Sequence, residues 1–272
     1  MNWYTIESIQ PGVWHISEPI GAIEPRFGVD SANMFLVAGT ERAAVIDTGM
    51  GIGDLRAAIE ALTPLPLLVC NTHSHWDHIG SNHQFDEIAI HAREFELLNR
   101  EQDVRGIREQ MARPEARAIL PSGFDGTQYR IKTRPGTRSL SDDELIDLGG
   151  RTLRVLPTPG HSRGHVSYFD EQHGLLFSGD MAYAGPLYAC FKGGDPAAFQ
   201  ASAHRLANSS DSVRLIAPGH NQVLQGGAFL RELADAADRA QSGAAPALPA
   251  DEFIGGREVR FGSFSIWLPK DS

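Results

Sequence analysis

A six-residue stretch in the first half of the chain carries four side chains that commonly bind metal ions. In the stretch HSHWDH these are His73, His75, Asp77 and His78. Imidazole nitrogens and carboxylate oxygens at this density suit Zn²⁺ or another divalent cation. Neither a hydrophobic core nor an ordinary surface requires such a cluster, so the stretch predicts a metal site.

Three more potential ligands follow later in the chain, each after a glycine that ends an apolar stretch. They are His161, Asp180 and His220. Glycine allows the backbone to turn sharply and to direct a short ligand inward. Alone, a Gly-His or Gly-Asp pair is more often a surface turn. Their combination with the first cluster favours a single metal centre.

The elements that must position the first cluster are short strands and one helix. Runs rich in Val, Ile and Phe, bounded by Gly, Pro and Asp, predict a β-meander over 12–17, 32–37 and 42–46. Apolar residues at helical spacing predict a helix over 55–62, with Asp54 near its start. The wholly apolar run 67–70 is typical of a central strand and leads directly into His73.

The second half of the chain repeats this pattern. Residues 174–180 resemble 44–47, and 213–220 resemble the strand before His73, which indicates two related half-sheets with ligands on one edge. Helices are expected from Asp195 to Leu206 and from about Ala228 to Ala240.

Two segments fall outside this repeat. Residues 92–140 are interpreted as an inserted helical and loop segment, and about 226–270 as a C-terminal helix plus a closing hairpin with a structural role. We expect all of 1–272 to form a single domain.

Composition limits the possible functions. The chain has 272 residues, 42% hydrophobic and 21% charged, which is typical of a globular protein. The formal net charge of -10 repels nucleic acid, so no nucleic-acid partner is expected. The two cysteines, Cys70 and Cys190, are interpreted as core thiols. The chain shows neither a long apolar run nor the pattern of a secretion signal, so no membrane partner and a cytoplasmic location are expected.

Over roughly residues 10–225 the chain resembles the metallo-β-lactamase superfamily, in which a His-x-His-x-Asp-His motif precedes a distant His, Asp and His. The resemblance implies an α/β fold, a four-layer αββα sandwich with two metals at one edge. By position, His73, His75 and His161 would hold the first metal and Asp77, His78 and His220 the second, with Asp180 bridging. It implies two Zn²⁺ ions, with Fe or Mn an alternative in one or both positions.

The same resemblance implies a mechanism and a substrate class. A hydroxide that bridges the metals would attack an activated carbonyl, oriented by Asp77 as a catalytic residue. True β-lactamases lack the bridging Asp180, whereas hydroxyacylglutathione hydrolases, other thioesterases and lactonases keep it. A small-molecule thioester, ester or lactone substrate is therefore expected. Asp47 is interpreted as a carboxylate that orients a metal-bound histidine or has a structural role, and not as a ligand.

Several residues are candidates for contact with the substrate, each with a structural alternative. Tyr183 matches a position where lactonases and some thioesterases place a catalytic phenol, but it could equally be packed under the metal loop. Arg130, Lys132 and Arg134 could hold an anionic tail such as coenzyme A or glutathione, although such runs are more often solvated. Lys192 and Tyr188 are further candidates, and Phe124, Tyr129 and Phe191 could line an acyl pocket or fill the core.

Other classes remain open. A sulfur dioxygenase with one iron uses the same ligand types, and a phosphodiesterase or RNA-processing nuclease shares the motif. A β-lactamase is a minor alternative. A catalytically inactive scaffold would be expected to have lost at least one ligand, and all seven are present.

Overall fold

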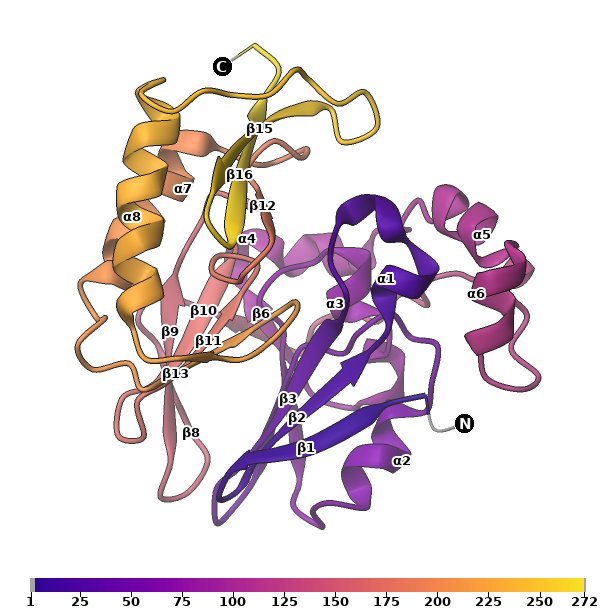
Figure 1. Cartoon of the computed structure of the whole chain (residues 1–272). Helices are drawn as coiled ribbons and strands as arrows, with labels where there is room; N and C mark the ends of the chain where they lie inside the picture. Colours follow the sequence, from indigo (N-terminus) through magenta and orange to yellow (C-terminus); the bar gives the residue numbers. More distant parts are fainter. Residues whose placement is uncertain (1–2, 272) are drawn as a thin grey trace. The chain divides into compact units, whose positions relative to one another are not determined.

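The computed structural model describes residues 3–271 and divides into two compact units (Figure 1). The first unit comprises Met1–Leu140 and Asp147–Arg151, and the second Ser141–Ile146 and Thr152–Ser272. Both units combine sheets with helices, so the predicted mixed α/β class is confirmed.

The first unit is built on a seven-stranded sheet in the order β1-β2-β3-β4-β5-β6-β7. Its strands β1 to β4 pair antiparallel, and β4 to β7 pair parallel. The strands are β1 (Thr5–Gln10), β2 (Val13–Glu18), β3 (Ala32–Ala38), β4 (Ala43–Ile46), β5 (Leu67–Cys70), β6 (Ile88–His91) and β7 (Arg138–Leu140). The predicted meander is thus present, preceded by β1, which the sequence analysis missed because all six of its residues are exposed or half-buried.

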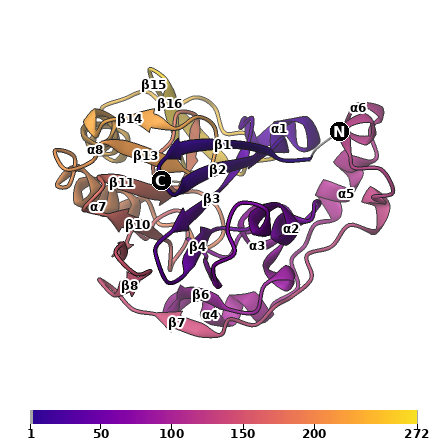
Figure 2. The same ribbon diagram turned by 90° about the horizontal axis from the view of Figure 1, so that it is seen from below.

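Two helices connect the parallel strands of this sheet: α2 (Leu55–Glu60) and α3 (Trp76–Ile79). In α2 the Asp54 side chain accepts a hydrogen bond from the Ala57 amide, while Leu55 and Ile59 are buried. The helix is therefore capped and amphipathic, as the sequence predicts. Figure 2 shows α2 and α3 together on one side of β3 and β4.

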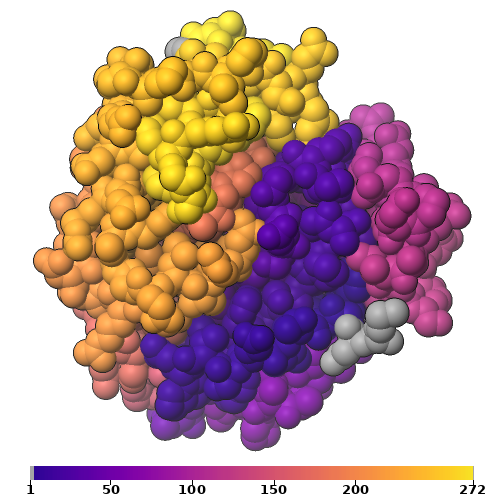
Figure 3. Space-filling model, in the orientation of Figure 1, coloured from indigo at the N-terminus to yellow at the C-terminus, as the bar shows by residue number. Residues whose placement is uncertain are grey.

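The segment 92–140 consists of short helical pieces joined by loops and ends in the strand β7. The helical pieces are α4 (Ala92–Phe95), η3 (Glu96–Asn99), α5 (Arg105–Met111), α6 (Pro114–Ile119) and η4 (Gly126–Gln128). Near the start of the unit lie α1 (Ile20–Ile23) and η1 (Pro25–Phe27), and η2 (Asn82–Gln84) follows α3. Figure 3 shows α5 and α6 on the surface beside α1, where Arg113 donates to the Ile23 carbonyl at 3.0 Å.

The second unit contains two sheets. The larger has the order β14-β13-β11-β10-β9-β8, and the smaller β12-β16-β15. The strands are β8 (Leu145–Asp147), β9 (Thr152–Pro157), β10 (Val166–Asp170), β11 (Leu175–Gly179), β12 (Pro186–Tyr188), β13 (Leu215–Pro218), β14 (Leu224–Gln225), β15 (Gly256–Phe261) and β16 (Phe264–Pro269). The predicted closing hairpin is β15–β16, but it also pairs with β12 and so forms a sheet of its own.

Two long helices complete the second unit, α7 (Pro196–Ala207) and α8 (Ala228–Gln241), which lie side by side in Figure 1. The Asp195 carboxylate accepts from the amides of Ala197 and Ala198, and Pro196 occupies the first helical position. The helix α8 begins at the predicted residue, α7 begins one residue after its N-cap Asp195, and both end one residue beyond the expected position.

The repeat seen in the sequence corresponds to a repeat of parallel strand pairs. In the first unit Ile46 of β4 lies opposite Cys70 of β5, and in the second Gly179 of β11 lies opposite Pro218 of β13. Asp47 therefore follows the first pair in the way that Asp180 follows the second. Each unit therefore has predicted ligands just after the carboxyl ends of a parallel strand pair, whereas His161 follows β9, which pairs antiparallel with β10.

Candidate metal centre

In the first unit the four predicted ligands lie after β5 and in α3. His73 Nε2 is 3.0 Å from His75 Nδ1, and His78 Nε2 is 3.9 Å from the Asp77 carboxylate. His73 and His78 are buried, with exposed fractions of 0% and 1%. The structure thus gathers these four side chains in one place in the unit.

Asp47 holds one of these histidines in a defined orientation. Its carboxylate accepts hydrogen bonds from the Thr72 amide at 2.7 Å, the Thr72 hydroxyl at 2.8 Å and His78 Nδ1 at 2.9 Å. With its Nδ1 proton donated to Asp47, His78 keeps Nε2 available as a ligand atom. Asp47 has a φ of 58°, a left-handed conformation that Asp and Asn tolerate better than most residues.

Asp47→Asn is therefore expected to weaken metal binding while preserving the backbone. Asn tolerates the same φ, but its side-chain amide would place an N–H group where the carboxylate now accepts from His78 Nδ1. This disfavours the His78 tautomer with its proton on Nδ1 and Nε2 available to the metal. Loss of such an outer partner lowers metal affinity by roughly 10- to 100-fold. Competition with a chromophoric chelator measures the affinity.

Asp170→Asn is the matched control for this change, because Asp170 is a buried carboxylate that accepts from His173 Nδ1 at 2.9 Å. We expect its metal affinity to equal that of the wild type. An unchanged affinity in Asp47→Asn would contradict the role given to Asp47.

A buried polar network fixes the backbone of α3, the helix that carries His78. The His78 carbonyl accepts from the Thr48 amide at 2.8 Å and from the Asn71 side chain at 3.0 Å. Asn82 accepts from the Thr48 hydroxyl at 2.8 Å and donates to Asn71 at 2.8 Å. The sequence analysis missed these residues, although an Asn directly after an apolar strand signals a buried polar partner.

Glu18 secures the loop that follows β4. It is buried, accepts from the Met50 amide and accepts from Trp3 Nε1 at 2.6 Å. The pKa of Glu18 is raised to about 7, chiefly by burial and to a smaller extent by the charge of Asp77, while the hydrogen bonds from Met50 and Trp3 oppose the rise. Through the hydrogen bond from Met50, Glu18 thus anchors the loop that begins with Asp47.

In the second unit the three predicted ligands converge on one oxygen atom. Asp180 Oδ2 is 3.3 Å from His161 Nε2 and 3.3 Å from His220 Nε2. Asp180 and His220 follow the parallel strands β11 and β13, and His161 follows β9. All three side chains are buried.

The smaller sheet of this unit orients His161. Its Nδ1 lies 2.8 Å from the carbonyl oxygen of Tyr188, the last residue of β12, so the N–H donates to that carbonyl. Nε2 is thereby directed at Asp180. The hairpin that the sequence analysis treated as purely structural therefore supports, through β12, the backbone that holds a predicted ligand.

His165, which received no role from the sequence, supports Asp180. The Asp180 amide donates to His165 Nε2 at 3.0 Å, so the ring proton is on Nδ1, which lies 2.9 Å from the Thr158 hydroxyl. Thr158 in turn contacts the Ser167 hydroxyl at 3.1 Å. Sequence reasoning missed His165 because its partner is a backbone amide, which leaves no mark in residue types.

The structure places the two aromatic candidates in the interior. The Tyr183 hydroxyl donates to the Pro186 carbonyl, and its ring packs edge-on against His220 at 5.4 Å. The Tyr188 ring is stacked on Phe191 at 4.6 Å, and burial raises the pKa of its hydroxyl well above the ordinary value. Lys192, which follows Phe191 in the sequence, is exposed.

The three cations of the predicted run, Arg130, Lys132 and Arg134, lie in different environments. Arg130 and Lys132 are exposed and line a cavity of about 860 Å³ with Phe124 and Tyr129, whereas Arg134 donates to the Asp86 carbonyl at 3.4 Å. The hypothesis that cations hold an anionic tail of the substrate therefore concerns Arg130 and Lys132.

Cys70 is free and buried as predicted, and Cys190 is free but only half-buried.

The donor atoms in each unit fit a divalent metal. Two ligand atoms bound to one tetrahedral Zn²⁺ at about 2.0 to 2.1 Å lie about 3.3 Å apart. The separations from Asp180 to His161 and His220 match this value. His78 and His161 also donate their second ring nitrogen to an oxygen atom, as metal-bound histidines do.

Comparison with known proteins supports the resemblance to the metallo-β-lactamase superfamily. A family model described as the metallo-beta-lactamase superfamily matches residues 27–220. Acyl-coenzyme A thioesterase MBLAC2 of Bos taurus is 33% identical over 234 residues, 81% of this chain and 82% of that protein. Hydroxyacylglutathione hydrolase of Synechococcus sp. (strain JA-2-3B'a(2-13)) is 32% identical over 155 residues, 57% of this chain and 49% of that protein.

Among solved structures, a metallo-beta-lactamase family protein from Thermus thermophilus aligns with a TM-score of 0.64 and 22% identity, over 87% of this chain and 82% of that one. At this identity the likeness supports the fold. The family model covers more than half of the residues, including every predicted ligand. The chain therefore belongs to the metallo-beta-lactamase superfamily and is one of its hydrolases.

Proposed function

We propose that the two ligand clusters together form a two-metal centre that hydrolyses thioesters, with acyl-coenzyme A as the preferred class. In this centre His73, His75 and His161 hold the first metal, and Asp77, His78 and His220 hold the second. The observation that carries the proposal is Asp180 Oδ2, equidistant at 3.3 Å from one histidine of each predicted set. A carboxylate in that position suits a bridge between two cations.

Two zinc ions bound there would lower the pKa of water toward neutrality and polarise the thioester carbonyl. Asp77 accepts a hydrogen bond from the attacking water and orients its oxygen toward the acyl carbon. The new carbon–oxygen bond replaces the carbon–sulfur bond, giving a carboxylic acid and a free thiol. A thiol of ordinary pKa near 8.5 is a good leaving group, so little general-acid help is required.

The thioester class is supported by the relatives. One is named an acyl-coenzyme A thioesterase and another a hydroxyacylglutathione hydrolase, and both names describe cleavage of an acyl–sulfur bond. The first relative matches a larger share of this chain than the second. We therefore rank acyl-coenzyme A above glutathione thioesters, and both above lactones.

A panel of substrates tests this ranking. Purified protein prepared without chelator is assayed with an acyl-coenzyme A, a glutathione thioester, a lactone and a cephalosporin. We expect the highest kcat/KM for the acyl-coenzyme A. Turnover of the cephalosporin or lactone alone would overturn the proposal, as would oxygen uptake with a persulfide and no hydrolysis, which would indicate a dioxygenase.

Tyr183 allows a separate prediction. Because its hydroxyl donates to the Pro186 carbonyl, we expect Tyr183→Phe to leave kcat within about twofold of wild type and to lower stability by about 1 kcal/mol. Steady-state kinetics and denaturant unfolding measure the two effects. A fall in kcat of about 100-fold would instead assign the phenol to the oxyanion or leaving group.

The expected cytoplasmic location stays a prediction. No helix among residues 3–271 is both long enough and apolar enough to cross a membrane.

A further inference from the structure

We infer that the cavity lined by Arg130 and Lys132 binds the phosphate groups of the coenzyme A portion of the substrate, an inference that rests on the proposed function. This cavity, called the Arg130 pocket, measures about 860 Å³ and lies within the first unit. Its lining includes Arg108, Arg130, Lys132, His83, Phe124 and Tyr129.

The cations of this pocket are available to a ligand. Within residues 3–271, Arg130 and Lys132 form no ion pair with a carboxylate, and both side chains are exposed. Arg108 is half-buried and donates to the Tyr129 carbonyl at 3.4 Å. Guanidinium groups bind phosphate oxygens through two parallel hydrogen bonds, and lysine binds them as a point charge.

The pocket also contains three carboxylates, two of which are fixed in place by hydrogen bonds that leave their negative charge unchanged. Asp54 accepts from the Ala57 amide at the start of α2, and Asp125 accepts from the amide and hydroxyl of Thr127. The third, Glu101, is exposed on the rim and opposes an anion. The chain as a whole carries a formal charge of -10, so a phosphate-bearing substrate needs local cations of this kind.

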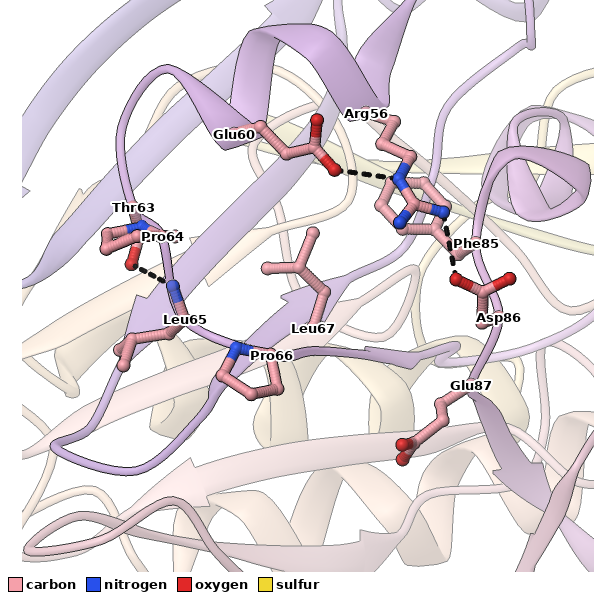
Figure 4. Close-up of a pocket in the computed structure, with 10 residues that line it drawn as sticks. All are labelled: Arg56, Glu60, Thr63, Pro64, Leu65, Pro66, Leu67, Phe85, Asp86 and Glu87. Atoms are coloured by element: carbon pink, nitrogen blue, oxygen red, sulfur yellow. Dashed lines mark hydrogen bonds and ion pairs between the residues drawn. The ribbon is translucent and has the colours of Figure 1, made fainter.

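A second cavity of the same unit shows the opposite arrangement. It measures about 520 Å³ and contains Arg56, which pairs with Glu60 at 2.8 Å and with Asp86 at 3.0 Å (Figure 4). Its lining includes Leu67 at the start of β5, whereas the metal motif follows the end of that strand. Its cation is already neutralised, so this cavity is not a candidate for the substrate.

The Arg130 pocket shares a wall with the segment that carries Asp77 and His78. Tyr129 donates to the Met50 carbonyl at 2.6 Å, and its ring lies 6.4 Å from that of Trp76. Gly51, also in the lining, packs so closely that an added Cβ would lie 2.6 Å from the carbonyl carbon of Gly80. The pocket therefore lies next to the segment that carries two of the predicted ligands of the first unit.

Phosphates fit this pocket better than the carboxylates of glutathione. Three separate cationic groups suit a ligand with several charged oxygens, and half-buried Phe124 offers an aromatic face for an adenine ring. Burial and the charge of Lys132 lower the pKa of His83, so this side chain adds a neutral hydrogen-bonding group. Coenzyme A combines several phosphates with adenine, and glutathione has neither.

Calorimetric titration of the full-length protein with adenosine bisphosphate, the nucleotide portion of coenzyme A, tests the pocket without any catalytic step. We expect binding to the wild type and about tenfold weaker binding to the double variant Arg130→Ala/Lys132→Ala. The double variant Arg205→Ala/Lys270→Ala removes two exposed cations of the second unit and should bind as the wild type does. Equal affinity in all three proteins would overturn the inference.

Kinetics separate this inference from the proposed function. For an acyl-coenzyme A the Arg130→Ala/Lys132→Ala variant should show a KM raised about tenfold with kcat unchanged. For an acyl N-acetylcysteamine thioester, which lacks phosphates, both constants should equal those of the wild type. Hydrolysis of both substrates with no change in KM would refute the pocket and leave the thioesterase intact. Nucleotide binding that is lost in the variant, without any thioester hydrolysis, would support the pocket and refute the thioesterase.

Glu101→Gln tests the pocket in the opposite direction, because it should raise the affinity for adenosine bisphosphate and removes an anion instead of a cation. Because it takes away the exposed negative charge on the rim, affinity for adenosine bisphosphate should rise about two- to threefold at low salt. Weaker or unchanged binding would contradict the assignment of the pocket to phosphate.

Discussion

Asp180→Ala is expected to lower kcat/KM for the thioester substrate by about 10³-fold and to reduce bound zinc from two ions per chain to about one. The substitution removes the oxygen that lies 3.3 Å from both His161 and His220. Metal ions contribute several kcal/mol to stabilisation of the transition state, and each 1.36 kcal/mol corresponds to a tenfold change in rate. Steady-state kinetics and metal analysis of one preparation measure both quantities.

Asp235→Ala is the control for this prediction, since Asp235 is an exposed aspartate of α8 in the same unit. It should retain full activity and metal content. An Asp180→Ala protein that still bound two zinc ions and lost less than about tenfold in kcat/KM would show that Asp180 does not bridge the metals.

Gly160→Ala is expected to destabilise the second unit by roughly 2 to 5 kcal/mol and to lower the zinc content. Gly160 has a φ of 138°, and a Cβ there would collide with the backbone of Phe199 and lie 2.6 Å from its Cβ. Left-handed strain contributes about 1 to 2 kcal/mol and overpacking about 1 to 3 kcal/mol. Because His161 is the next residue, relief of the clash moves a metal ligand. Chemical unfolding with metal analysis tests the prediction.

Gly123→Ala is the control for Gly160→Ala, because it introduces backbone strain without a steric collision of the new Cβ. Gly123 has a φ of 82°, but nothing lies within 4 Å of an added Cβ. It should therefore lose only the strain contribution, about 1 to 2 kcal/mol, and keep its zinc. Equal losses in the two variants would mean that the packing of Gly160 against α7 has no role in placing His161.

Residue types and spacing were sufficient to predict the strands that end at the ligands. The run 67–70 has only apolar side chains and becomes β5, the central parallel strand before His73. The resemblance between 44–47 and 174–180 reflects two parallel strand pairs of the same kind. Such elements are predictable because burial on both faces of a parallel sheet requires continuous apolar sequence.

The glycine argument was correct for only part of the second cluster. Gly160 and Gly179 have positive φ values of 138° and 51°, whereas Gly219 is not among the described glycines with positive φ. Its amide instead donates to the Gly179 carbonyl at 2.9 Å and continues the pairing of β11 with β13. A glycine before a ligand therefore did not always mark a left-handed turn.

The supporting contacts were the least predictable part of the site. His165 accepts from a backbone amide, and His161 donates to a backbone carbonyl on β12. Every residue possesses these backbone groups, so sequence patterns carry no record of which one is used. The pairing of β12 with β16 depends on residues nearly 80 positions apart and is likewise invisible to local periodicity.

Titration of zinc into metal-free protein tests the central claim most directly. The protein is stripped with a chelator, the chelator is removed, and hydrolysis of an acyl-coenzyme A is followed as zinc is added. The two-metal thioesterase predicts no activity at the start and a rise that levels off at two zinc ions per chain. Full activity without added zinc, or a protein active only with one iron and inert toward thioesters, would contradict it.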